Sequence, residues 1–564
     1  MKLKAKDLKI NYSKMRNRMK INNIDIVIIA IFFLLIFVKL YLVSGQTLFA
    51  ISHAGHDDRL FLLLSESLIR LNWLGDYNNL TLAKGVFYPL YIAFNFYLGL
   101  PLLFSEHLLY ILASIIFSIG IKPLIKKSWV RLLIFAFILF NPITFTNEPF
   151  TRVIREGVYI SLTLLVIAFT LGWFLRRKSY KRSLLWSLGL GIVLGAFWHT
   201  REEGIWIIPY ITVLFGYYLF ENVRLSKFFT KTTFKLFIPL IIPFLILFTT
   251  ILSISLINYK YYGEFNTVEF KSSNFVKAYG ALTSVKSEQH IERVPVTKNT
   301  RQKIYEESPA FKELEVFLEG DVGKAWASGS DEIQGGWFMW ALRDAVAYSG
   351  YYKDGATSES YYARLADEIS NACLEKRLDC PNGVRNSMNP PFEKSYFSPL
   401  IKTTAKAGSF VVSFDNFSPY SSTSGGNSEL MVLFEDLTRE NINPLPAENL
   451  LPNQTLLNSY KLEILGYIGK FYTLVNPVLF ILSSILFFSH LLNIVRNRKI
   501  SSISVILSGL FLLFITRLVL ISYIHLTSFG AINQLYLSPA YIVLACFTSI
   551  ALGYFIDQKS SKSN

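Results

Sequence analysis

The sequence has few cysteines and histidines and lacks the short motifs of several large enzyme classes. It contains 3 Cys and 7 His in 564 residues, and no second CxxC or nearby His completes a zinc ligand set around the cysteines. It also has no GxxxxGKS/T, HExxH or GxSxG segment. A P-loop ATPase, a zinc protease and an α/β-hydrolase therefore each lose the motif that normally supports them.

Acidic residues are scarce relative to basic ones. Lys and Arg number 56 against 40 Asp and Glu, which gives a formal net charge of +16 and a pI near 9.4. The basic residues gather in blocks beside apolar runs, so orientation in a membrane and contact with anionic lipid account for them. We therefore predict no nucleic-acid partner.

Long apolar runs are what the sequence has in abundance. The chain is 52% hydrophobic with a mean hydropathy of +0.37, and runs of this kind cross membranes as helices. The first run follows a basic tail and no small-residue cleavage site comes after it, so we interpret it as an uncleaved helix. The runs cover residues 24–44, 86–104, 106–122, 130–147, 156–175, 183–199, 203–220, 235–257, 464–493, 500–524 and 533–556.

The charges between the runs set the number of spans. Counting 86–104 as a span would place most basic loops outside, against the positive-inside rule. We predict instead that 86–104, rich in Tyr and Phe, lies as a helix at the outer interface. The fold class is then a polytopic α-helical membrane protein with about ten transmembrane helices, in a cell membrane of the bacterial inner or plasma type.

This topology predicts the organisation of the whole chain. The outward loop 45–105 belongs to the first membrane module, and the long segment 258–463 has no spanning run, so we expect a soluble extracytoplasmic α+β domain there. In order, the predicted parts are the cytoplasmic tail 1–23, the N-terminal transmembrane module 24–257, the soluble domain 258–463, the C-terminal helices 464–556 and the cytoplasmic tail 557–564.

Two smaller features carry local predictions. Cys373 and Cys380 lie seven residues apart in the outward segment, so a disulfide closing a small loop is plausible, with two separate thiols as the alternative.

The segment GLGIVLG at 189–195 lies inside an apolar run. Gly191 and Gly195 therefore indicate a close helix-packing contact rather than a nucleotide loop.

Ionisable residues gather where apolar segments meet the predicted outer face. Charges at such positions are costly to bury and tend to be functional, although each one alone can be an interfacial anchor or part of a structural ion pair. Arg517 lies deeper, about 10 Å inside the outer end of its span, where snorkelling or helix pairing is the alternative. The others are Asp57, Asp58, Glu66, Lys84, Arg152, Arg155, Glu156, Arg201, Glu202 and Glu203.

The order of motifs in the first 260 residues resembles the GT-C superfamily of membrane glycosyltransferases, which includes protein O-mannosyltransferases and lipid A aminoarabinose transferases. HDD at 56–58 stands where those enzymes carry an acidic pair. The GT-C enzymes carry Gly-Asp-Trp where this chain has GDY at 75–77. They carry a Lys-Pro segment where this chain has residues 84–89, which run from Lys84 to Pro89. RVIREGVY at 152–159 is similar to their second loop, and HTREEGIWIIP at 199–209 to a Thr-Arg-Pro-Glu-Gly element.

The resemblance implies transfer of a sugar from a polyprenyl-phosphate-linked donor to a glycan, lipid or protein acceptor on the extracytoplasmic face. Asp57 is the expected general base. Cations are expected to offset the charge of the departing phosphate. In full, the candidate catalytic residues are Asp57, Asp58 and Glu156, the candidate donor-phosphate ligands are Lys84, Arg155, Arg201 and Arg517, and the candidate substrate-binding residues are His56, Arg59, Glu202 and Glu203.

Three alternatives stay open at this point. No cofactor is predicted, but His53, His56, Asp57 and Asp58 could gather round one divalent ion, for which Mn²⁺ or Zn²⁺ would suit best. A multi-span transporter or lipid flippase of an envelope polysaccharide pathway is the main rival function, although its charges would be expected nearer the midplane. An inactive assembly subunit would keep the fold and lose the acidic residues, which this sequence keeps.

Overall fold

The computed structural model describes residues 23–225, 231–327, 329–426, 428–442 and 452–562. The predicted tail 1–23 therefore lies almost wholly outside the described residues, as does the end of the tail 557–564. The described residues are mostly helical, and they form no strand beyond three isolated backbone bridges. The polytopic helical fold class is thus confirmed.

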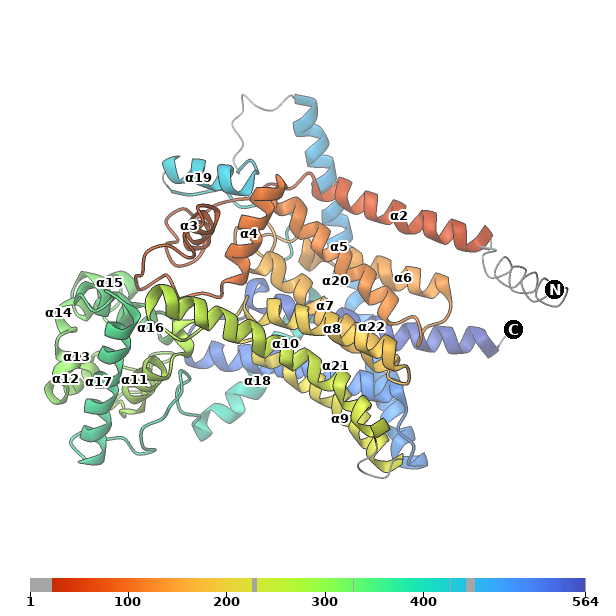
Figure 1. Ribbon diagram of the computed structural model, residues 1–564. Helices are drawn as coiled ribbons and strands as arrows, with labels where there is room; N and C mark the ends of the chain where they lie inside the picture. Colours follow the sequence, from red (N-terminus) through yellow and green to blue (C-terminus); the bar gives the residue numbers. More distant parts are fainter. Residues whose placement is uncertain (1–22, 226–230, 328, 427, 443–451, 563–564) are drawn as a thin grey trace, which may run out of the picture.

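Ten helices correspond to the ten predicted spans (Figure 1). Eight of the described helices are long and apolar enough to cross a membrane. The other two are α6, whose 12 residues cover only about 18 Å, and α8, whose polar first turn lowers its apolarity. The ten are α2 (Asn23–Val43), α5 (Leu102–Gly120), α6 (Ser128–Leu139), α7 (Glu156–Leu175), α8 (Tyr180–Trp198), α9 (Ile208–Leu225), α10 (Lys231–Tyr262), α20 (Pro452–Asn497), α21 (Ser502–Thr527) and α22 (Gln534–Lys562).

The run 86–104 does not form a continuous span. It divides into α4 (Phe87–Leu98) and the start of α5, and the break lies at Gly99, which adopts a left-handed φ of 68°. Gly is favoured at such a helix end because it has no Cβ to clash. No single helix therefore covers the run 86–104, which agrees with the prediction that this run does not form a span of its own.

The membrane helices surround α7. In the most apolar stretch of α7, 89% of the residues are buried. The corresponding shares for α2, α10 and α20 are 17%, 22% and 11%. These three helices expose apolar side chains such as Phe37, Phe248 and Leu474, as expected of surfaces that face lipid. Helix α7 is therefore the central element against which the loops of the site are fixed.

Glycines bring α8 and α10 into close contact, as the sequence predicted. A Cβ on Gly191 would lie 2.6 Å from Ile246 Cδ1 and 3.1 Å from the Pro243 Cα, and one on Gly195 would lie 3.2 Å from Thr250. Only glycine allows this approach. The helix-packing interpretation of these residues is confirmed.

Basic residues meet at the end of the helices where α22 ends. Lys127 donates through its backbone N–H to Asp557 at 2.8 Å. Arg177 pairs with Glu221 at 2.8 Å and donates to Ser502 Oγ at 3.2 Å. Arg176 donates to the Gly120 carbonyl at 2.9 Å. The C-terminal ends of α5, α7 and α9 and the start of α21 therefore share one end, as the count of spans requires.

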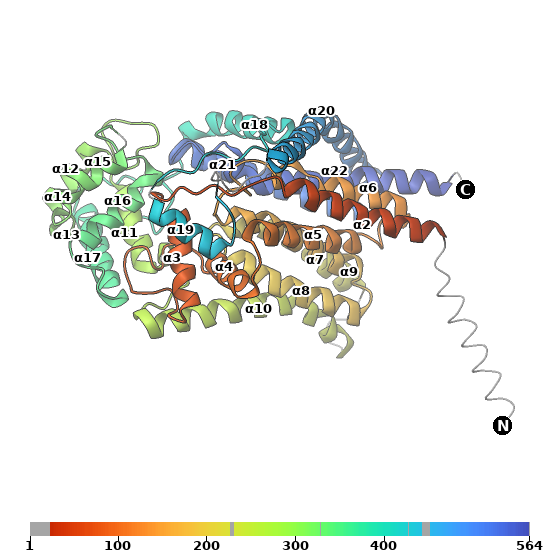
Figure 2. The ribbon, with the colours of Figure 1, turned by 90° about the horizontal axis from the view of Figure 1, so that it is seen from above.

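At the opposite end, a unit of short helices follows α10 (Figures 1 and 2). Its buried side chains form an apolar core separate from that of the membrane helices. The Cys373–Cys380 disulfide is confirmed. The helices of this unit are η3 (Glu269–Lys271), α11 (Ser273–Ser284), α12 (Lys298–Glu307), α13 (Pro309–Lys312), α14 (Glu315–Leu318), α15 (Asp321–Ala327), α16 (Gly335–Tyr348) and α17 (Gly355–Leu374).

The α+β character expected for 258–463 is not confirmed, since its described residues form helices without strands. Apolar residues recur at helical spacing in its longest helix, where Tyr361, Leu365 and Ile369 are buried on one face. The segment also divides. Helix α18 (Phe397–Ser413), preceded by η4 (Lys394–Tyr396), packs on α20, α21 and α22, while α19 (Ser428–Thr438) packs on α4 and on α3 (Asp58–Ile69).

Candidate active site

The predicted charged residues meet at the end of the membrane helices that carries α11–α17. They come from the starts of α3 and α7, the loop before α4, the short connection between α8 and η2 (Gly204–Ile207), and the inner face of α21. We call these residues the charge cluster. It comprises Asp57, Asp58, Lys84, Arg152, Arg155, Glu156, Arg201, Glu202, Glu203 and Arg517, joined in neighbouring ion pairs.

Asp57 is the most accessible acid of the charge cluster. Its side chain is 50% exposed, whereas the other four carboxylates are 23% exposed or less. Lys84 Nζ donates to Asp57 Oδ1 at 2.8 Å. Desolvation alone would raise the pKa of Asp57, but the charge and hydrogen bond of Lys84, with Arg155 and Arg152, hold it below the usual 3.8. Asp57 is therefore ionised at neutral pH.

Asp58 is fully buried and has a structural partner. Arg152 binds it in a fork, with Nε 2.9 Å from Oδ1 and Nη2 2.6 Å from Oδ2. The backbone supports this geometry because the Phe49 N–H donates to the Thr151 carbonyl at 2.8 Å. Such a bidentate pair fixes both side chains. Asp58 thus joins the first loop to the second and does not face an acceptor.

The third loop is tied to both of the others. Arg155 Nη1 lies 2.8 Å from both carboxylate oxygens of Glu202, and Glu202 also accepts the backbone N–H of Gly85 at 3.2 Å. A Cβ on Gly85 would lie 2.1 Å from the His199 carbonyl oxygen, so the first loop passes the third at a distance that only glycine allows. The position of Lys84 is set by this contact.

The deepest part of the charge cluster lies between α7 and α21. Arg201 pairs with Glu156 and lies 2.7 Å from Glu203. Arg517, which is fully buried, lies 3.6 Å from Glu203 and donates to the Tyr536 carbonyl at 2.6 Å. The charges of Arg201 and then Arg517 overcome desolvation and lower the pKa of Glu203 to about 2. These residues hold the helices together electrostatically.

One further cation borders this group. Five carboxylates face five cations within the charge cluster. Lys271 of η3 adds a sixth positive charge close enough to Glu202 and Glu203 to interact with them, and its Nζ lies 5.0 Å from the centre of the Trp198 ring. Glu148 interacts with Arg152 in the same way, so cations and carboxylates are balanced around the site. A bound phosphate would therefore compete with carboxylates for these cations.

Two predicted substrate-binding residues lie outside the ion pairs. His56 contacts Trp326 and Trp340 edge-on, at 4.7 and 4.8 Å between ring centres, and its Nε2 lies 3.7 Å from Asp344 Oδ1. Arg59 is exposed on α3. Within the described ranges, no three His, Cys, Asp or Glu side chains are placed to share a metal ion.

Sequence reasoning missed several residues that border the site. Lys271 and the tryptophans of α15 and α16 come from the soluble segment, about 200 residues or more after Asp57. Trp340 lies under Lys84, with 5.0 Å from Nζ to the ring centre. A tryptophan in an amphipathic helix is usually a core residue, so no local signal distinguished these. Arg152 was noted as part of the second loop but was given no role.

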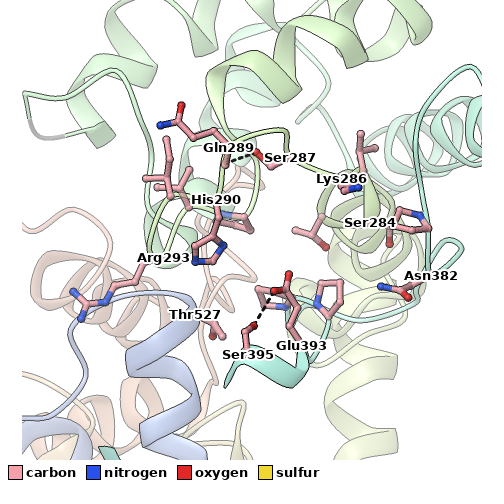
Figure 3. Close-up of a pocket in the computed structure, with 18 of the residues that line it drawn as sticks. Ser284, Lys286, Ser287, Gln289, His290, Arg293, Asn382, Glu393, Ser395 and Thr527 are labelled. Carbon is pink, nitrogen blue, oxygen red and sulfur yellow. Dashed lines mark hydrogen bonds between the residues drawn. The ribbon is translucent and has the colours of Figure 1, made fainter. Parts of the chain in front are cut away.

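A separate cavity of about 420 Å³ lies between the α11–α12 connection, the segment after the disulfide and the end of α21. In Figure 3 the side chains of His290, Glu393 and Asn382 point toward its interior, and Ser395 donates to Glu393 at 3.1 Å. None of the charge-cluster residues lines this cavity. It is a second polar recess on the same end of the molecule, and no role follows from its lining alone.

No family model matches the chain, and no curated protein matches it. Among solved structures, the chain is similar to ArnT from Cupriavidus metallidurans in the apo state, with 13% identity over 93% of this chain and 76% of that one at a TM-score of 0.28. It is also similar to the same protein bound to undecaprenyl phosphate, with 13% identity over 95% and 78% at a TM-score of 0.27. Because both TM-scores lie below 0.5, we base the functional proposal on this chain's own residues.

Proposed function

We propose that this protein is an integral membrane glycosyltransferase of the GT-C type. It would move a sugar from a polyprenyl-phosphate-linked donor to an acceptor hydroxyl on the extracytoplasmic face. The observation that carries the proposal is the half-exposed carboxylate of Asp57 at the rim of a group of paired charges built from three loops, with Lys84, Arg155 and Arg201 as its cations. The resemblance of those three loops to GT-C motifs supports the same conclusion.

The proposed reaction is a displacement at the anomeric carbon. The acceptor hydroxyl attacks that carbon, a glycosidic bond forms, and the bond from the carbon to the phosphate oxygen breaks. Asp57 takes the hydroxyl proton as general base. The polyprenyl phosphate leaves with the bonding electrons, and nearby cations offset the negative charge that develops on its oxygen.

The pairing of Asp57 with Lys84 suggests how donor binding would prepare the base. Lys84 is 10% exposed and holds Asp57 in the unliganded protein. A donor phosphate would compete for the Lys84 ammonium, since a charge-assisted hydrogen bond to phosphate is as strong as one to a carboxylate. Releasing Asp57 in this way would raise its basicity when the donor is in place. Asp58 and Glu156, both engaged by arginines, would serve as structural acids.

The proposed side of the membrane follows from charge. Lys127, Arg177 and the last turns of α22 lie at one end of the helices, and the charge cluster lies at the other. Under the positive-inside rule the basic end faces the cytoplasm. A polyprenyl-linked donor suits the opposite face because it needs no cytosolic nucleotide sugar, and the polyprenyl lipid and the bilayer would be the partners there.

Replacing Asp57 by Asn tests the proposal. Asn keeps the size and removes the basicity, so we expect glycosyl transfer to fall by about a hundredfold or more while binding of undecaprenyl phosphate persists. Transfer would be followed by mass spectrometry of envelope glycans in a deletion strain that carries each variant. Glu66→Gln is the matched control, because Glu66 lies on the same helix and pairs only with the exposed Arg70.

A parental rate in a folded Asp57→Asn protein would remove Asp57 as the base. If Asp58→Asn and Glu156→Gln also left transfer unchanged, the glycosyltransferase proposal would fall and a transporter or lipid flippase would replace it. Arg201→Ala is expected to weaken transfer and lipid binding together, because it removes a cation from the deep part of the charge cluster.

A further inference from the structure

Three tryptophans of the soluble unit face the rim of the charge cluster. Trp326 ends α15, and Trp337 and Trp340 lie three residues apart on one side of α16. Trp340 is 5% exposed and packs under Lys84. Trp326 and Trp337 are stacked, with 6.0 Å between ring centres and 23° between planes. Aromatic rings therefore border the loop that carries Asp57.

A partly buried network fixes this aromatic group to the first loop. Asp344 accepts the indole N–H of Trp326 at 2.8 Å and the side-chain amide of Asn79 at 2.6 Å. The same carboxylate lies 3.7 Å from Nε2 of His56, the residue before Asp57. Helix α16 and the first loop are thus held in one arrangement, so the tryptophan rings keep a fixed position relative to Asp57.

The exposure of these rings differs in a way that points to a ligand. Trp337 is 40% exposed although it stacks on Trp326 and lies 6.1 Å from Phe529. A large aromatic residue that serves only as core would be buried. In addition, His56 Nε2 is a buried nitrogen without a hydrogen-bond partner among the described residues. Trp326 lies between the two, since it contacts His56 on one side and stacks with the exposed Trp337 on the other.

We propose that Trp337 and Trp326 form a platform for the pyranose ring of a sugar acceptor. This inference rests on the proposed function and names its acceptor class as a carbohydrate. A pyranose has an apolar C–H face, which packs on aromatic rings, and a rim of hydroxyls, which need hydrogen-bond partners. The Asp344 carboxylate, which is 18% exposed, supplies one such partner, and an acceptor seated there would present a hydroxyl toward the loop that carries Asp57.

The test uses the purified full-length protein and saturation-transfer NMR with a panel of methyl pyranosides. The parent is expected to saturate the C–H face of at least one pyranoside. Trp337→Ala should weaken that binding at least about fivefold, in line with the worth of an aromatic contact, while Trp337→Phe should retain most of it. Tyr348→Ala is the matched control, since Tyr348 is a 66% exposed aromatic residue near the other end of α16.

Binding of undecaprenyl phosphate, measured on the same samples, separates the two proposals. Retention of lipid binding in Trp337→Ala together with loss of pyranoside binding supports the platform. Equal pyranoside binding by Trp337→Ala and the parent overturns it, as does the absence of any pyranoside signal from a parent that binds the lipid, and both results leave the glycosyltransferase proposal standing. Preferential binding of farnesyl phosphate at Trp337 also overturns it, because the rings would then contact the lipid chain.

Discussion

Glu203 holds two buried arginines that have few other partners. It lies 2.7 Å from Arg201 and 3.6 Å from Arg517, which are 4% and 0% exposed. Among the described residues, Nε and Nη1 of Arg517 make no hydrogen bond. Removing the carboxylate would therefore leave two buried guanidinium charges without the negative charge that stabilises them. Breaking a buried ion pair in this way costs several kcal/mol.

We expect Glu203→Gln to lower the free energy of unfolding at neutral pH by about 3 to 5 kcal/mol. The folded pKa of Glu203, about 2, lies below the ordinary 4.5. Its stabilisation is therefore complete above about pH 4.5 and is lost as the pH falls toward 2. Between about pH 4.5 and 2, the melting temperature in detergent should fall less steeply for the variant than for the parent. Glu313→Gln, which breaks an exposed pair with Arg364, should change stability by about 1 kcal/mol or less.

The sequence could place the acidic and basic residues of the site but could not pair them. Helix ends are visible in the apolar pattern, so the sequence places Asp57, Arg155 and Arg201 at one face of the membrane. Their partners depend on which loops touch. Asp58 meets Arg152 94 residues away, and Glu202 reaches the backbone of Gly85 117 residues away. Nothing local to either residue encodes such contacts.

At the scale of elements, small residues decide how the helices approach one another. A Cβ on Gly172 would lie 2.0 Å from the Trp186 ring, and a Cβ on Gly189 would lie 2.2 Å from the Phe169 ring. Both rings can pack so closely only because these positions are glycine. These contacts pack α8 against α7, while Gly191 and Gly195 pack it against α10. Lipid gives little hydrophobic drive for helix association, so such close packing supplies much of the stability.

Gly191→Leu is expected to disrupt the contact of α8 with α10 and to lower the amount of folded protein recovered in detergent. The new side chain would meet Ile246 and the Pro243 backbone, and overpacking of this kind costs about 1 to 3 kcal/mol. Gly216→Leu is the matched control in α9, because a Cβ there meets nothing within 4 Å. Size-exclusion recovery and melting temperature compare the two. Equal behaviour of the two variants would contradict the packing role.

Helix types were easier to predict than helix lengths or the character of the soluble segment. Each of the ten runs predicted to span contains a helix, and eight of these helices are long and apolar enough to cross a membrane. Helix α6 ends at Leu139 instead of the expected 147, because a 3₁₀ turn capped by Asn141 begins at Pro142. The soluble segment carries Gly, Pro and mixed charge, which favoured an α+β interpretation. Its tertiary packing selects helices instead, a decision that short apolar stretches do not reveal.

For the whole molecule, the two ends of the helices differ in chemistry. One end gathers Lys127, Arg177 and the C-terminal part of α22. The other gathers the charge cluster and the separately packed α11–α17 unit (Figure 2). This difference between the two ends would suit an enzyme whose lipid donor and acceptor meet on one face of the membrane. The proposed function therefore requires that the charge cluster face the extracytoplasmic side.

Cysteine labelling in intact cells tests this orientation. The described cysteines are the buried Cys546 and the disulfide pair, so the parent should give little background. An impermeant maleimide is expected to label Lys353→Cys, in the exposed loop before α17, in intact cells. It should label Lys126→Cys, in the exposed loop before α6, only after permeabilisation, because basic loops remain in the cytoplasm. The reverse pattern would place the charge cluster in the cytoplasm and, with it, exclude transfer on the extracytoplasmic face.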